Sequence, residues 1–85
     1  MDPLIIKNNT TIEEILEYAM NEDEHAAGFY LKASKKAFDP DVKSFLIALA
    51  TMEEMHYHEL KNKLEEVRAS RFSVQGILDS FESGH

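Results

Sequence analysis

The segment AFDPD, residues 37–41, is the feature that most limits how this chain can fold, because it separates two long stretches of helical periodicity. Asp39 is a favourable N-cap, Pro40 suits the first position of a helix, and the charge of Asp41 favours the N-terminal end of the helix dipole. One helix therefore ends here and another begins. The sequence predicts an all-α fold whose main unit is an antiparallel two-helix hairpin.

The predicted helices span residues 11–38 and 40–68. Thr11 followed by Glu14 makes a capping box at the start of the first helix. The periodicity lapses around residues 68–73, and Ser73 is a candidate cap for a short third helix over residues 74–82. All 85 residues are expected to form one domain. Apolar residues recur at alternating steps of three and four in both long helices: Ile12, Leu16, Ala19, Ala26, Tyr30, Ala33 and Ala37 in the first, and Val42, Leu46, Leu49, Leu60, Leu64 and Val67 in the second.

Charge and composition exclude several classes of function. The formal net charge of −7 argues against a nucleic-acid partner, because binding phosphates requires a basic face. The chain has no cysteine, so neither a disulfide framework nor a cysteine-based metal site is available. The N-terminal segment MDPLIIKNNT has an apolar run that is too short for a signal peptide or a membrane span. We therefore expect a cytoplasmic protein with no membrane partner.

A single hairpin of this length leaves apolar side chains without cover. Two helices of about 27 residues span roughly 40 Å each and bury only the seam between them. We expect the chain to complete its fold by self-association, most simply as a homodimer in which two hairpins form a four-helix bundle. The side chains that remain to be covered are Phe29, Phe38, Phe45, Ile47 and Tyr57.

Three ionisable residues, Asp23, Glu53 and His56, interrupt the two apolar stripes. Asp23 lies 16 residues before Asp39, while Glu53 and His56 lie 14 and 17 residues after it. In an antiparallel hairpin these separations place all three at one level, roughly 21–26 Å from the turn. A buried carboxylate without a partner is costly, and a divalent cation would compensate its charge. Carboxylate oxygens with one imidazole suit iron or, as the alternative, manganese.

A homodimer would bring two copies of each ligand together. Four carboxylates and two imidazoles are the ligand set of a di-iron carboxylate bundle, in which two helices give one acid each and two give Glu-x-x-His. In such a site Glu53 would bridge two ions, with Asp23 and His56 as terminal ligands. The sequence therefore predicts a di-iron centre that is shared across the dimer interface.

Residues 15–67 resemble one half of a rubrerythrin-type, ferritin-like protein. The resemblance rests on elements in the family's order: an acid seven residues before the Tyr of a Phe-Tyr pair (Asp23 and Tyr30), an Asp-Pro turn, and the run LATMEEMH at residues 49–56. It implies a ferritin-like four-helix bundle in which the same three ionisable residues are the metal-binding and catalytic residues.

The single-hairpin length is similar to that of the encapsulated ferritins, whose short chains pair to form one ferritin bundle. This resemblance implies oxidation of Fe(II) by oxygen or peroxide, and hence a ferroxidase that serves iron storage or peroxide detoxification. It also implies rings of dimers, and it makes an encapsulin shell a candidate partner and compartment. Two alternatives stay open: an iron-binding module without turnover, and a purely structural helical module that self-associates.

One residue departs from the family pattern. The family's acid on the first helix is usually Glu, whereas this chain has Asp23, which is one methylene shorter. Glu22 is the alternative ligand if the helix rotates or carries a π-bulge. Tyr30 is expected in the core, with its hydroxyl hydrogen-bonded to a ligand carboxylate.

Overall fold

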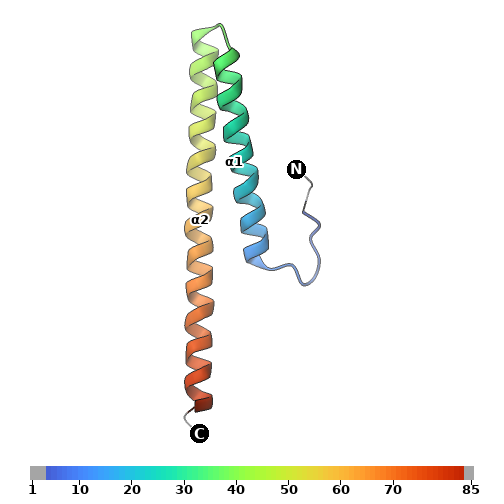
Figure 1. The fold of residues 1–85 in the computed structure, drawn as a ribbon, viewed down its shortest axis with the longest axis vertical. Helices are drawn as coiled ribbons and strands as arrows, with labels where there is room; N and C mark the ends of the chain where they lie inside the picture. The colour runs from blue at the N-terminus through green and yellow to red at the C-terminus, as the bar shows by residue number, and fades with distance from the viewer. Residues whose placement is uncertain (1–3, 84–85) are drawn as a thin grey trace.

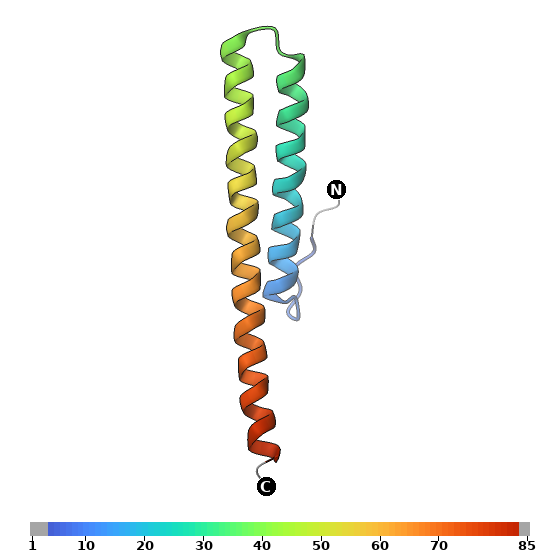
Figure 2. The same cartoon turned by 60° about the vertical axis from the view of Figure 1, so that its left-hand side comes forward.

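The structure is a hairpin of two long α-helices. The computed structural model describes residues 4–83, with side chains described as far as residue 71, and consists of α1 (Ile12–Lys36) and α2 (Pro40–Ser83). Figures 1 and 2 show the two helices packed side by side and antiparallel, with α2 continuing well past the start of α1. The molecule is accordingly elongated, with extents of 71 × 23 × 12 Å. The predicted all-α hairpin is confirmed.

Local hydrogen bonds explain where the helices begin. The Thr11 hydroxyl oxygen accepts a hydrogen bond from the backbone N–H of Glu14 at 3.1 Å, which caps α1 as its sequence predicts. At the start of α2 the Asp39 carboxylate accepts from the backbone N–H groups of Asp41, at 2.8 Å, and Val42, at 3.4 Å. Both caps satisfy backbone donors that have no partner inside the helix.

The first helix is shorter than predicted at both ends. It covers Ile12–Lys36 rather than residues 11–38, because Thr11 and Ala37 both have extended backbone angles. The residue before a proline is sterically kept out of the helical region, so the chain must leave α1 before it reaches Asp39. Residues 37–39 therefore form the whole connection between the helices.

The predicted break after residue 68 does not occur. Helix α2 runs without interruption from Pro40 to Ser83, so residues 74–82 continue α2 and do not form a separate short helix. The lapse of apolar periodicity removes a packing stripe, but residues 69–73 contain neither proline nor glycine, so nothing there breaks the backbone hydrogen bonds. Ser73 lies inside the helix and cannot act as an N-cap.

The seam between the helices is narrow and built largely from small side chains. Ala27 and Ser34 of α1 and Ala50 of α2 are buried. Among the residues whose burial is described, the larger buried ones are Leu16 and Leu64, toward the other end of the seam. The Ser34 hydroxyl donates to the backbone carbonyl of Leu31 at 2.7 Å, which allows this polar group to be buried. Small residues let the helix backbones approach closely but bury little apolar area.

Much of the apolar surface remains exposed in the single hairpin. Phe29 and Phe45 are 67% and 64% exposed, and Phe38 in the connection has no cover at all. Ile47 is also exposed, while Tyr57 is half-buried, so four of the five side chains expected to lack cover do lack it. Over the residues that the structure describes, neither helix has a stretch both long and apolar enough to cross a bilayer.

The Asp39 cap gives a direct test of how α2 begins. Replacing Asp39 with Ala removes the side-chain acceptor for two backbone N–H groups, and we expect the free energy of unfolding to fall by about 1 kcal/mol. The matched control is Asp39→Asn, which keeps a side-chain oxygen as acceptor. Its free energy of unfolding should fall much less. Urea unfolding followed by circular dichroism at one protein concentration measures both, and equal stabilities for all three proteins would contradict the role of the cap.

Candidate metal centre

The three ionisable residues that interrupt the apolar stripes lie together in the structure. Asp23 comes from α1, and Glu53 and His56 come from α2. Each offers one ligand atom, and these atoms all lie within 4.8 Å of one another. Asp23 and Glu53 are half-buried and His56 is exposed. We call these residues the acid–histidine group. The three side chains thus lie at one level of the hairpin, as their distances from the turn predict. That they bind a metal stays a prediction.

Helix geometry explains the arrangement within α2. Glu53 and His56 are three residues apart and therefore share one face of the helix. The His56 Nδ1 atom lies 4.0 Å from the Glu53 Oε2 atom, which is too long for a hydrogen bond. Their side chains are 51% and 24% exposed, respectively. Both groups therefore keep free lone pairs for a common ligand.

The pKa of Glu53 is raised above its ordinary value. The main cause is hydrogen bonding with the Asp23 carboxyl group, followed by burial and by the negative charge of Asp23, while His56 acts in the opposite direction. Two carboxyl groups that share one place cannot both ionise without a cost, so one of them tends to keep a proton.

The donor set fits a divalent cation such as iron. A cation between the two carboxylates would compensate their negative charges and remove the repulsion between them. Carboxylate oxygens and imidazole nitrogen are also donor types that iron accepts. Among the residues whose side chains are described, however, one hairpin brings together only these three ligands, and His56 is exposed. The group therefore fits one side of a metal site and leaves the other side open.

The alternative ligand Glu22 is not brought to this group. It is exposed, and its carboxylate is hydrogen-bonded to Tyr18, which is the main cause of the raised pKa of Tyr18. Helix α1 is regular from Ile12 to Lys36, so it carries no π-bulge that would turn Glu22 toward α2. The shorter Asp23 carboxylate reaches the group without such a distortion.

Tyr30 is half-buried in α1, two helical turns from Asp23. Its ring contacts Phe29 in an edge-on arrangement with centroids 5.7 Å apart. Among the described residues its hydroxyl makes no hydrogen bond to Asp23 or Glu53, so its expected role beside a ligand stays a prediction. His25 follows Glu22 by three residues and is likewise not part of the acid–histidine group; its ring Nδ1 lies 2.9 Å from the backbone oxygen of Asn21.

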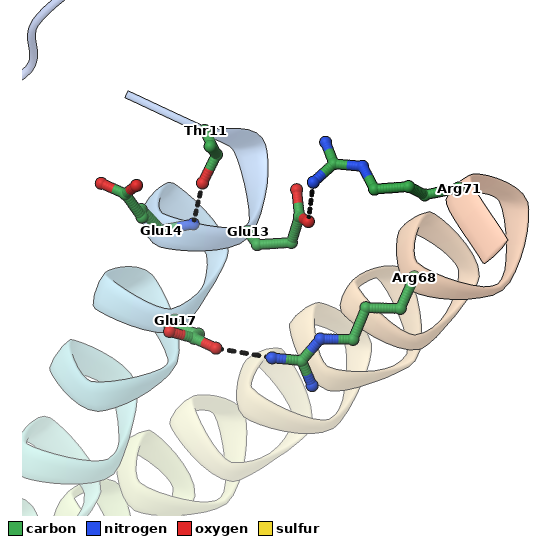
Figure 3. Close-up of polar contacts among 6 residues, drawn as sticks. All are labelled: Thr11, Glu13, Glu14, Glu17, Arg68 and Arg71. Atoms are coloured by element: carbon green, nitrogen blue, oxygen red, sulfur yellow. Dashed lines mark hydrogen bonds and ion pairs between the residues drawn. The ribbon is translucent and has the colours of Figure 1, made fainter. Parts of the chain in front are cut away.

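Two acids of α1 and two arginines of α2 meet near the start of α1, and the sequence did not predict this contact. Figure 3 shows that Arg68 and Arg71 of α2 reach across to Glu17 and Glu13 of α1. The signal in the sequence is weak: it consists of two acids four residues apart on one helix and two arginines three residues apart on the other. Such pairs are common on exposed helices, and only the structure shows that they meet.

Comparison with known proteins gives one finding. A family model described as Rubrerythrin matches residues 1–64, which contain the whole acid–histidine group and end before the two arginines. No curated protein and no solved structure matches the chain.

The raised pKa of Glu53 predicts how metal-free protein responds to pH. The folded state holds the Glu53 proton more tightly than the unfolded state, so this group stabilises the fold at low pH and loses that effect as pH rises through its raised pKa. We expect Glu53→Gln to melt a few degrees above the unmodified chain at neutral pH, with a smaller difference near pH 4. The neighbouring exposed change Glu54→Gln is the control. A Glu53→Gln difference that does not depend on pH would contradict this account.

Proposed function

The chain belongs to the rubrerythrin family of ferritin-like, di-iron carboxylate proteins, and on this premise we propose that Asp23, Glu53 and His56 bind iron in a site that a second copy of the chain completes. The observation that carries the proposal is the meeting of these side chains, from two helices, within 4.8 Å. They interrupt otherwise apolar helix faces at one level, where ordinary packing would favour apolar residues.

The number of ligands supports a second copy. One hairpin offers two carboxylates and one imidazole, whereas a pair of iron ions in a carboxylate bundle uses four carboxylates and two imidazoles. A two-fold axis beside the group would supply this set from two identical chains. Glu53 is the proposed bridging ligand, because its carboxyl group interacts with both Asp23 and His56, which would be the terminal ligands.

The exposed apolar residues support the same arrangement. Phe29 and Phe45 are among the most exposed large side chains of the hairpin, and Met52 beside Glu53 is 51% exposed. Leu49 and Leu60, one turn to either side of Glu53 and His56, are only half-buried. Covering these residues with a second hairpin would remove apolar area from water and would also exclude water from the acid–histidine group.

The proposed reaction is the oxidation of Fe(II) with oxygen or peroxide as the electron acceptor. Bound iron would supply the one-electron redox couple. The chain's own contribution is to hold the ions with deprotonated ligands: the raised pKa of Glu53 means that protons compete with a cation for this carboxyl group more strongly than at an ordinary Glu. Iron binding is therefore expected to weaken as pH falls.

A second candidate is iron binding without turnover. Asp23 has one methylene fewer than Glu, so its carboxylate has less freedom to change its position as an ion changes charge. This restriction favours a site that holds iron over one that passes it through a redox cycle.

Metal stoichiometry tests the proposed site. Protein loaded with Fe(II) without oxygen and then desalted should retain about one iron per chain, in a dimer or a multiple of it by light scattering. Glu53→Ala and His56→Ala should lose the iron and remain helical by circular dichroism, while the exposed neighbour variant Glu54→Ala should keep it. Full iron in Glu53→Ala, or none in the unmodified protein, would refute the site.

Oxidation kinetics separate the two candidate functions. Stopped-flow absorbance after mixing the Fe(II)-loaded protein with oxygen, or with peroxide, should show oxidation faster than that of free Fe(II) at the same pH. The acceleration should disappear in Glu53→Ala. Tight iron binding with oxidation no faster than in solution would favour the second candidate, an iron-binding module without turnover.

A further inference from the structure

Two ion pairs join α2 to the beginning of α1. Arg68 Nη2 donates a hydrogen bond to Glu17 Oε1 at 2.6 Å, and Arg71 Nη1 donates to Glu13 Oε2 (Figure 3). Among the side chains that the structure describes, these are the only ion pairs between the two helices. We call Glu13, Glu17, Arg68 and Arg71 the ion-pair clasp.

We propose that the ion-pair clasp fixes the position of α1 along α2, and thereby holds Asp23 opposite Glu53 and His56. Its members are thus positioning residues for the iron site, and this inference rests on the function proposed for that site. The clasp joins the first turns of α1 to α2, the connection at residues 37–39 closes the other end of the hairpin, and Asp23 lies on α1 between these two points.

The seam beside the acid–histidine group does little to fix the position of the helices. The buried residues nearest to it are Ala27 and Ala50, whose small side chains interlock weakly. Leu16 and Leu64 are the larger buried pair, and Leu16 lies next to Glu17 of the clasp. The contacts that resist sliding of α1 are therefore concentrated around the clasp.

A helix transmits a displacement from the clasp to the site. Glu17 and Asp23 are six residues apart on α1, or roughly 9 Å along a stiff helix. A slip of one residue would move α1 by about 1.5 Å and turn Asp23 by about 100° if the same contacts were to form. Such a shift would remove its carboxylate from a group whose ligand atoms lie within 4.8 Å of one another.

Glu13 restricts the positions that α1 can take along α2. Its side chain is only 18% exposed, and its Oε1 atom is buried without a hydrogen-bond partner. Because water reaches this carboxylate poorly, its negative charge is stabilised mainly by Arg71. A position of α1 that separated Glu13 from Arg71 would leave a buried charge without a partner and would cost free energy. The partly exposed pair of Glu17 and Arg68 adds a second contact between the helices, one turn further along α1.

The clasp depends on the part of α2 that lies beyond the family match. That match ends at residue 64, whereas Arg68 and Arg71 follow it on the uninterrupted helix. Residues three apart share a helix face, so the continuity of α2 is what allows both arginines to face α1. A break at residues 68–73 would have separated them.

A charge swap at the more exposed pair tests the inference. We expect Arg68→Glu to weaken anaerobic Fe(II) binding about threefold or more, at a temperature where the protein remains fully helical, because Glu17 then faces a like charge. The double variant Glu17→Arg/Arg68→Glu restores the pair in reverse and should recover the affinity. The matched control Lys61→Glu makes the same charge change on exposed α2 and should bind Fe(II) at least as tightly, since added negative charge attracts cations.

Amide hydrogen exchange on metal-free protein gives an independent measurement. Residues 13–23 should exchange faster in Arg68→Glu than in Lys61→Glu, and the swapped pair should slow them again. Unchanged exchange, unchanged Fe(II) affinity in Arg68→Glu, or an equal loss in Lys61→Glu would overturn the inference. If the unmodified protein binds no Fe(II), the proposed function fails instead, and exchange alone then decides whether the clasp holds α1.

Discussion

Close contact between two helices along a seam of small side chains is the constraint on which the rest of this structure depends. Ala27 and Ala50 let the backbones approach, and this approach lets an acid of α1 reach a carboxylate and an imidazole of α2. Larger residues there would bury more apolar area but would hold the ligands apart. The hairpin thus combines modest internal packing with precise placement of a polar group, which is a common compromise at functional sites.

The same constraint explains why a single hairpin leaves much apolar surface exposed. Two helices form a single layer, with no second layer to cover the outer apolar side chains, and few of the residues from 4 to 71 are buried. In the proposed function, a second hairpin would cover these apolar side chains and would supply the remaining ligands. Apolar packing and metal binding would then be satisfied by one interface.

Local chemistry made much of this predictable from the sequence. The Asp39 cap and the Pro40 start depend on residues adjacent in the chain, and the level of Asp23, Glu53 and His56 follows from helix rise alone. The predicted end of the second helix was wrong because the apolar period lapses at residues 68–73, although this stretch contains neither proline nor glycine. The contacts of Arg68 and Arg71 could not be predicted, because long side chains reach partners that spacing does not define.

The open side of the acid–histidine group has a thermodynamic consequence. If each hairpin carries half of the ligands, then cation binding and chain association are linked equilibria, and each must strengthen the other by the same factor. The cellular supply of Fe(II) would then set the fraction of assembled chains as well as the fraction of loaded sites. A small helical hairpin with little internal core would in this way report metal availability through its own state of assembly.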